Sequence, residues 1–375
     1  MPEFLPPDLV ELRDRAAALA RETLGPLRAD STLSSSERAG RVRAASKAAG
    51  IFPMTQPVAF GGTEASALAL VVVRDTLGQA DVGGLAGLFG PRPGVLATVA
   101  EPLRSSHLLP MLAGEKRGGF AFTEPADAPR PTWAMLRGEE LIINGAKSYV
   151  TGGAEADFVT ALVQIEIGDT QQAAFVVIDL DRPGVHLERR FGTLDGSHHG
   201  AFSFTDVVVP NTCIVGAPGD GMGRALGQIS DVRMAIAANC VGTIGWIMTY
   251  LTEYLQAPRR GGLPRGASEH ARLRYGELRV QAYAARSVLY RTARLVDSGE
   301  NAVNECIAAK AFITEAAGRV IDTAVQLVGG EALVEGHPLE ATLRGLRTTR
   351  LAEGETDQLY VNVARGRLDL GLGAI

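Results

Sequence analysis

The hydrophobic pattern of this chain switches period twice, and that switch constrains the fold more than any other feature. Up to about residue 117 the apolar side chains recur at helical spacing, as over 8–50. From 118 to 210, short apolar runs follow one another with turn residues between them and no helical stretch. Helical spacing then returns over 223–256, 269–298, 302–328 and 338–351, with a last helix starting near Glu355.

This order predicts an α+β protein, mostly α. Long helices joined by short loops indicate a C-terminal four-helix bundle, and short strands in succession indicate a middle antiparallel β-barrel or sandwich. The predicted domains are an N-terminal helical domain, a middle β-domain and a C-terminal helical bundle, at 1–117, 118–221 and 222–375. Within the β-domain, Asn144-Gly145 predicts a tight turn between a strand at 141–143 and a returning strand at 148–151.

Composition excludes several classes of function. The chain has a formal net charge of −5 and a sequence pI near 5.8, which argues against a nucleic-acid surface. The three cysteines are scattered, and the six histidines are dispersed except for His198-His199, so neither a disulfide framework nor a metal site is expected. The N-terminus lacks a signal-peptide pattern, and no run reaches the roughly 18 apolar residues that span a bilayer. We therefore expect a cytoplasmic protein with no membrane span.

One carboxylate stands out by its position. Glu353 precedes Gly354 at the point where one predicted helix should stop and the next should begin. Such a loop can aim an acid into a cavity, although most loop carboxylates only solvate turns or cap helices. Glu353 is therefore a candidate catalytic residue.

Two glycine-containing segments have competing interpretations. Gly219 to Gly223 looks like a dinucleotide-binding loop, but it does not follow the first strand of a βαβ unit, so a flexible lead into a long helix is favoured. Gln326 to Gly330 ends a helix with the Gly expected at a C-cap. Its paired glycines would also permit close approach to a ligand phosphate or ribityl chain.

Two further segments place hydroxyl and backbone donors beside aromatic rings. They are Thr123-Glu124-Pro125, just after a predicted strand, and Tyr149-Val150-Thr151, on a predicted returning strand. Such groups can hold an oxidised isoalloxazine, whose rim is a row of acceptors and donors. The alternative for each segment is ordinary strand-end chemistry.

Together these segments resemble the acyl-CoA dehydrogenase family over essentially the whole chain. The segments that carry the resemblance occur in the family's order: Leu109-Pro110, Gly114 to Lys116, Phe122 to Pro125, Ile143 to Lys147, Tyr149 to Thr151, Phe204 to Pro210, Gln326 to Gly330, Pro338 to Glu340, Arg344, and Arg350 to Gly354. The resemblance implies the family's three-part fold and tetramers built from dimers, with FAD contacted by two subunits. It also implies an electron-transferring flavoprotein as acceptor.

The activity implied by the resemblance is α,β-dehydrogenation of an acyl-CoA thioester to the 2-enoyl-CoA. A buried carboxylate removes the α-proton while hydrogen bonds stabilise the developing enolate, and flavin N5 accepts the β-hydride. Glu353 falls on the base position of most of the family. Some members instead place the base on a bundle helix just before an Arg that matches Arg233; the residue there is Val232, so that alternative base is absent.

Further site residues are implied by the same match. The positions that correspond to FAD contacts are Phe120, Phe122, Thr123, Tyr149, Val150, Thr151, Arg259, Arg260, Gln326, Gly329, Gly330, Glu355 and Asp357. The positions that correspond to substrate contacts are Pro129, Asp231, Arg233, Ala352 and Gly354.

Several departures from the family pattern fall on these contacts. Ala128-Pro129-Arg130 replaces Gly-Ser-Asp, and Pro258 to Gly262 lacks the aromatic of an Arg-x-x-Phe-Gly segment. Ala352 replaces an aromatic residue and would enlarge the pocket beside the base. Glu355 replaces a Thr, which should repel an FAD phosphate unless it is turned away or paired with Arg259 or Arg260.

Four interpretations remain open on these departures. One is a divergent dehydrogenase with an unusual acyl group, which the retained Glu353 favours. A second is a degenerate subunit that works only beside a paralogue in a heteromeric enzyme. A third is a non-catalytic CoA- or partner-binding scaffold. A fourth, oxygenase or nitro-compound chemistry, is disfavoured because nitroalkane-oxidising relatives carry Asp at the base position.

Overall fold

The computed structural model describes residues 4–168, 170–259, 262–371 and 373. The chain folds as two units: Met1–Gly90 with Ser230–Ile375, called here the helical unit, and Pro91–Ile229, called the sheet unit. The N-terminal and C-terminal helices thus belong to one unit, whereas residues 91–117 go with the sheet. The three predicted domains were divided differently, at 117/118 and 221/222.

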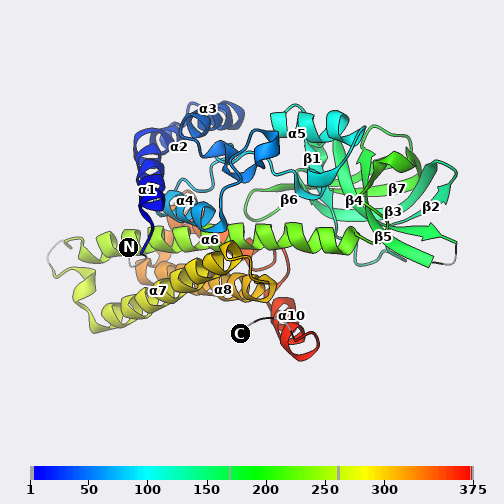
Figure 1. Ribbon diagram of the computed structural model, residues 1–375. Coiled ribbons are helices and arrows are strands. Elements are labelled where there is room, and N and C mark those ends of the chain that lie inside the picture. The colour runs from blue at the N-terminus through cyan, green and yellow to red at the C-terminus, as the bar shows by residue number, and fades with distance from the viewer. Residues whose placement is uncertain (1–3, 169, 260–261, 372, 374–375) are drawn as a thin grey trace. The chain divides into compact units, whose positions relative to one another are not determined.

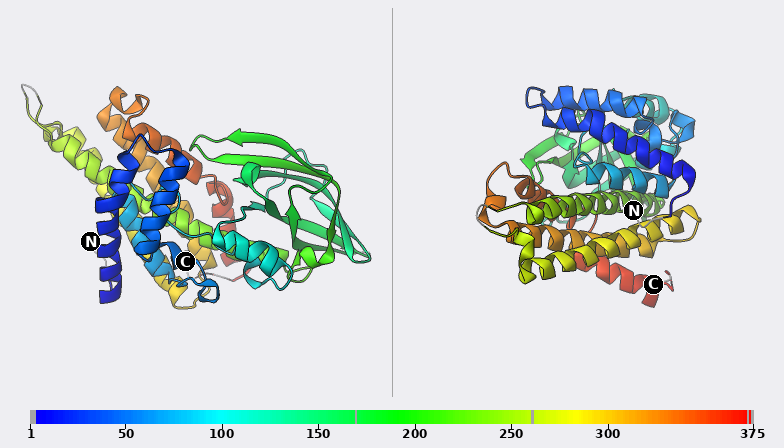
Figure 2. Two further views of the ribbon diagram at one scale, coloured as in Figure 1. Left: turned by 90° about the horizontal axis from the view of Figure 1, so that it is seen from above. Right: turned by 90° about the vertical axis from the view of Figure 1, so that its left-hand side faces the viewer.

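The helices lie close to where the hydrophobic spacing predicts them (Figure 1). Their bounds are α1 Pro7–Leu19, α2 Gly25–Ala29, α3 Ser35–Ala48, α4 Ala67–Gln79, α5 Leu109–Ala113, α6 Gly221–Gln256, α7 Glu269–Asp297, α8 Val303–Val328, α9 Pro338–Thr349 and α10 Thr356–Leu368. In the helical unit, α7 and α8 run side by side in both views of Figure 2. The predicted C-terminal helices are therefore confirmed.

Two helix starts show what fixes these bounds: a local contact at one and a tertiary contact at the other. Ser34 and Glu37 form a reciprocal capping box at the start of α3. At the start of α4, the carboxylate of Asp297 accepts hydrogen bonds from the N–H groups of Ala67 and Leu68, at 2.7 and 2.9 Å. This second cap comes from the end of α7, so it forms only when the tertiary structure forms.

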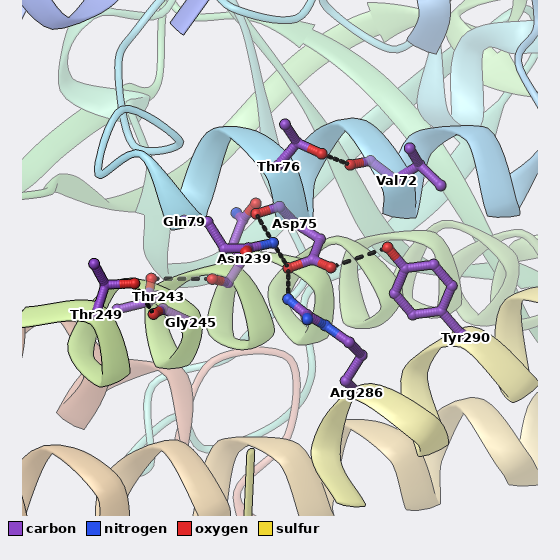
Figure 3. Close-up of polar contacts among 10 residues, drawn as sticks. All are labelled: Val72, Asp75, Thr76, Gln79, Asn239, Thr243, Gly245, Thr249, Arg286 and Tyr290. Atoms are coloured by element: carbon purple, nitrogen blue, oxygen red, sulfur yellow. Dashed lines mark hydrogen bonds and ion pairs between the residues drawn. The ribbon is translucent and has the colours of Figure 1, made fainter. Parts of the chain in front are cut away.

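A buried polar network joins α4 to α7 (Figure 3). Asp75 is fully buried. Its carboxylate accepts hydrogen bonds from Arg286 Nη2, Tyr290 Oη and Gln79 Nε2, each at 2.9 Å. Because an unpaired buried carboxylate is costly, these donors make the packing of α7 against α4 specific.

By length and composition, α6 is the one helix in the described part of the chain that could cross a membrane, and 50% of its most apolar window is buried within the structure. The buried side chains include Val241, Ile244, Ile247 and Leu251, which belong to the core of the helical unit. Packing in that core accounts for the apolar composition of α6.

The sheet unit contains one mixed, curved sheet (Figures 1 and 2). Its strands are β1 Gly118–Ala121, β2 Trp133–Arg137, β3 Glu140–Thr151, β4 Phe158–Ile167, β5 Thr170–Asp179, β6 Val185–Gly192, β7 His198–Pro210 and β8 Ile214–Val215. The order is β6-β7-β3-β2-β4-β5-β8, and β1 pairs with β4. The predicted middle β-domain is confirmed, but β1 and β2 both pair with β4 in parallel, whereas the other pairings are antiparallel.

The predicted hairpin turn at Asn144-Gly145 is wrong. Both residues lie inside the continuous strand β3, at a register shift against β7. The side chain of Asn144 exchanges two hydrogen bonds with Asp206 across this bulge, both at 3.0 Å. Gly145 has φ +137°, and a Cβ there would lie 2.6 Å from the Cα of Thr132. Close approach of two backbones, rather than chain reversal, therefore requires this glycine.

Candidate active site

The loop between α9 and α10, residues 350–355, is called here the base loop. Two consecutive residues in it have left-handed backbone conformations, Glu353 with φ +54° and Gly354 with φ +106°. A Cβ on Gly354 would lie 2.9 Å from a methyl carbon of Leu359 and 3.4 Å from the guanidinium of Arg233. Glycine is therefore required after Glu353, and a non-glycine residue at φ +54° needs support from its surroundings.

Two buried cations supply that support through the backbone. Arg233 Nε on α6 donates to the carbonyl oxygen of Glu353 at 3.0 Å, and Lys310 Nζ on α8 donates to the carbonyl oxygen of Gly354 at 2.7 Å. Arg233 is only 7% exposed and Lys310 is fully buried. Among the described residues, no hydrogen bond or ion pair engages the Glu353 carboxylate itself. The loop is thus held by its carbonyls while the carboxylate stays available.

Burial and these cations act on the acidity of Glu353 in opposite directions. Desolvation raises the pKa of the half-buried Glu353 carboxyl, and the charges of Arg233 and Lys310 lower it, leaving a pKa above its usual range. Burial lowers the pKa of Lys310 to about 8. A partly desolvated carboxylate with a raised pKa is a stronger base than one in water, which suits a general base.

The backbone N–H of Glu353 is also available. Within the part of the chain that the structure describes, this N–H donates to no carbonyl oxygen. A free N–H beside a base can donate to an oxygen that becomes negative as a neighbouring proton is removed. A half-buried carboxylate and a free donor therefore come from the same residue.

The other predicted residues near the base loop are mostly exposed. Ala352, Glu355 and Asp357 lie at the surface of the helical unit, and so does Asp231 on α6. Glu355 occupies the N-cap position of α10, and Asp357 lies in the first turn of that helix, where the helix dipole stabilises negative charge. The described residues include no ion pair between Glu355 and Arg259.

The helical unit does not bring all predicted cofactor residues to the base loop. Gln326 and Gly329 lie at the C-terminal end of α8, where Gly329 is the C-cap with φ +91°, and Gly330 follows. Gln326 is 16 residues from Lys310 on the same helix, or about 24 Å at 1.5 Å per residue. The predicted helix end at these glycines is confirmed. Arg259 is exposed in the loop after α6, and Arg260 lies outside the described residues.

In the sheet unit, the two segments predicted to hold a flavin ring lie side by side. The N–H of Ser148 donates to the carbonyl oxygen of Thr123 at 2.8 Å. A pocket of about 350 Å³ next to the first of these segments is lined by Phe122, Thr123, Glu124, Pro131, Thr132, Leu162 and Gln164. Phe120 stacks on Phe122, with ring centroids 6.0 Å apart.

Tyr149 presents an exposed aromatic surface in the second of these segments. Its backbone is left-handed, with φ +53°, and the residue is 61% exposed. Its ring lies 5.2 Å from Phe191 and 6.1 Å from His199, and the last two stack at 5.5 Å. Tyr149 is thus the exposed, strained member of an aromatic cluster whose other two rings are partly buried, and a planar aromatic ligand such as an isoalloxazine ring could cover it.

The remaining predicted residues of the sheet unit differ in accessibility. Thr151 is exposed, and its hydroxyl lies 3.4 Å from His199 Nδ1. Pro129 is exposed in the turn before β2. The side chain of Val150 is fully buried, so only its backbone could contact a ligand.

An ion pair between a buried lysine and a partly buried glutamate supports the Phe122–Thr123 segment. Fully buried Lys147 pairs with Glu124 and also donates to the carbonyl oxygen of Phe122 at 3.3 Å. Thr132 donates to the Glu124 carboxylate through its N–H and its hydroxyl, at 3.2 and 3.0 Å. These contacts fix the segment against β3.

Sequence reasoning missed Lys310, Phe191 and His199. One available signal was the scarcity of lysine: the chain has four, at 47, 116, 147 and 310, against 37 lysines and arginines together. Two of the four, Lys147 and Lys310, are fully buried. A fully buried ammonium, in a chain whose other cations are mostly arginines, was therefore a signal that could have been followed. No group of three potential metal ligands occurs among the described residues.

Comparisons with known proteins point to one family. Residues 219–368 match the family model described as acyl-CoA dehydrogenase, C-terminal domain. An acyl-CoA dehydrogenase of Bacillus subtilis is 28% identical over 322 residues, covering 82% of this chain and 84% of the relative. Cyclohex-1-ene-1-carbonyl-CoA dehydrogenase of Geobacter metallireducens is 28% identical over 316 residues, covering 81% and 83%. A crystal structure of a probable acyl-CoA dehydrogenase from Mycobacterium abscessus superposes with a TM-score of 0.83 at 25% identity, covering 96% of this chain and 98% of that one.

Proposed function

Because the chain belongs to the acyl-CoA dehydrogenase family, whose members are FAD-dependent oxidoreductases, we propose that it dehydrogenates an acyl-CoA thioester with Glu353 as the α-proton base. The observation that supports the proposal is the environment of Glu353, both at its backbone and at its carboxylate. Its backbone is fixed by Arg233 and Lys310, and its half-buried carboxylate has a raised pKa.

The chain's own residues supply the acid–base part of this reaction. An α-proton of a thioester is too weakly acidic for a carboxylate in water, so the base must be desolvated and the enolate oxygen must be stabilised. The Glu353 carboxylate takes the α-proton, and the free N–H of the same residue donates to the thioester carbonyl oxygen. Ala352, beside the base, leaves room for a bulky or branched acyl group.

The cofactor in this proposal is FAD, which supplies the acceptor for the β-hydride when it is bound. Tyr149, Thr151, Phe122 and Thr123 would contact the flavin ring. Gln326 lies about 24 Å from Lys310 along α8, and Gly329 and Gly330 follow the end of that helix, which supports a role of these three residues toward the cofactor of a neighbouring subunit. We further propose a cytoplasmic homotetramer that passes electrons to an electron-transferring flavoprotein.

The test begins with the visible spectrum of the purified chain after incubation with FAD. Flavin bands and their anaerobic bleaching by one member of an acyl-CoA panel would support the proposal. Glu353→Gln should retain the flavin bands and bind the same acyl-CoA, but it should not be bleached. Bleaching of the Glu353→Gln variant at the rate of the unmodified protein would rule out this base.

A second candidate function is a subunit that binds FAD only beside a paralogue. The observation that favours it is the exposed Glu355 at the start of α10, because a carboxylate there would repel a cofactor phosphate. A colourless protein that takes up no FAD alone, but does so when mixed with a paralogous subunit, would establish this alternative.

A further inference from the structure

Lys310 is a fully buried ammonium that the proposed reaction does not itself require. It lies in the interior of the helical unit on α8, and its hydrogen bond to the carbonyl oxygen of Gly354 is 2.7 Å long. A buried lysine is costly because its charge loses hydration. Lysine is rare in this chain, which has four lysines among its 37 lysines and arginines, so a buried one stands out.

The Lys310 ammonium binds the base loop where two consecutive residues have left-handed backbone conformations. Glu353 and Gly354 are both left-handed, and their consecutive carbonyl oxygens accept from Arg233 and Lys310. For Glu353, a non-glycine residue, this conformation persists only when surrounding contacts impose it. With the Lys310 contact removed, the Gly354 carbonyl would lose a charge-assisted bond and the loop could relax.

We propose that Lys310 is a positioning residue for the base: it holds the Gly354 carbonyl so that Glu353 keeps the backbone conformation from which its carboxylate and N–H act together. This inference rests on the proposed function. It assigns no contact with substrate to Lys310. The charged and titratable groups that act on Lys310 are Cys240 and Arg233 on α6, Glu353 in the base loop and Glu315 on α8.

The first experiment is hydrogen exchange, measured on the FAD-loaded protein without acyl-CoA. Lys310→Met keeps a long side chain but removes charge and donor, and Lys310→Arg keeps both. We expect amides of residues 351–356 to exchange about tenfold faster in Lys310→Met, and more slowly in Lys310→Arg than in Lys310→Met, because each 1.4 kcal/mol of lost local stability is a factor of ten. Unchanged exchange in Lys310→Met would overturn the proposal.

The second experiment is the anaerobic rate of flavin reduction by the acyl-CoA identified above. Misplacing a base by about 1 Å costs on the order of 100-fold, so Lys310→Met should lose 10- to 100-fold in the limiting rate with little change in half-saturation. The acid limb of its pH profile should move to higher pH, because the lost cation no longer favours ionised Glu353. A rate and profile equal to those of the unmodified protein would overturn the proposal.

Asp75→Asn is the matched control, since Asp75 is also fully buried and its partners are Arg286, Tyr290 and Gln79. It should lower global stability but leave exchange in 351–356 and the reduction rate nearly unchanged. An equal rate loss in both variants would show a purely structural role for Lys310. If Lys310→Met does not fold, Lys310→Gln replaces it with the same criteria. If no acyl-CoA bleaches the unmodified protein, the proposed function fails, while the exchange measurement still decides the role of Lys310.

Discussion

Arg350 and Glu315 form a two-pronged ion pair across the helical unit, with Arg350 Nε and Nη2 donating to the two carboxylate oxygens at 2.7 and 2.6 Å. The hydroxyl of Thr356 donates to the same carboxylate at 2.9 Å. Arg350 begins the base loop and Thr356 follows it, so the Glu315 carboxylate on α8 binds residues at both ends of the loop. Lys310, five residues earlier on α8, binds the carbonyl oxygen of Gly354 within the loop. Side chains of α8 therefore contact the loop at its start, within it and at its end.

We expect Glu315→Gln to loosen the base loop without unfolding the protein. Its neutral amide keeps the size of the side chain but offers Arg350 one acceptor oxygen instead of two and no negative charge. Hydrogen exchange in 350–356 should accelerate, and flavin reduction should slow several-fold. Glu277→Gln is a suitable control, because Glu277 pairs with Arg274 on α7 at an exposed position; the same slowing in both would contradict the prediction.

We expect Glu353→Gln to stabilise the protein at neutral pH. The raised pKa of Glu353 means that the folded state holds this proton more tightly than the unfolded chain. The protonated Glu353 carboxyl therefore stabilises the folded state below the ordinary pKa of a glutamate, and this stabilisation is lost as the pH rises through the raised pKa of the folded state. Thermal unfolding should therefore show a higher midpoint for Glu353→Gln at pH 7, with the difference shrinking toward pH 4. A lower midpoint at pH 7 would mean that the carboxylate has a stabilising partner.

We expect Tyr149→Ala to weaken FAD binding by roughly tenfold, the loss of about one aromatic contact. The measurement is a fluorescence titration of the apoprotein with FAD. Tyr283→Ala on α7 is the control, since Tyr283 is similarly exposed, at 64% against 61%. Equal affinities for FAD in the Tyr149→Ala variant and the control would remove Tyr149 from the cofactor site.

We expect Asp75→Ala to cost about 3–5 kcal/mol of unfolding free energy, because it leaves Arg286 and Tyr290 without their buried acceptor. Tyr290→Phe removes only one of the three bonds and should cost about 1.5–3 kcal/mol. Denaturant unfolding of each variant measures both values. A smaller loss for Asp75→Ala than for Tyr290→Phe would contradict a network centred on the carboxylate.

We expect Gly145→Ala to destabilise the sheet unit more than Gly138→Ala does. Both glycines have positive φ, +137° and +63°, but a Cβ at Gly145 meets the backbone of Thr132, whereas one at Gly138 meets nothing within 4 Å. Gly138→Ala should cost about 1 kcal/mol of backbone strain, and Gly145→Ala several times that. Equal unfolding midpoints would show that β3 can shift at the bulge.

The helix pattern was predictable because helices carry their own hydrophobic periodicity and some carry local stop signals, such as Gly329 at the end of α8. The turn at Asn144-Gly145 was not, because the same dipeptide suits a hairpin and a bulge. The choice depends on Thr132 and Asp206, which are distant in sequence. The actual reversal uses Gly138 and Glu139 between β2 and β3, whose ends pair at Arg137 and Glu140.

The sequence by itself determined the resemblance to the acyl-CoA dehydrogenase family, the alternation of helical and strand segments, and the place of Glu353 between two helices. Only the tertiary structure decided that Glu353 and Gly354 are both left-handed and that Arg233 and Lys310 hold their carbonyls. The physical reason is that the spacing of apolar residues along a chain reflects local backbone hydrogen bonding and the one face that each helix or strand buries. The acidity of a carboxylate depends instead on burial and on charges contributed by residues more than 40 positions away, as Lys310 is from Glu353.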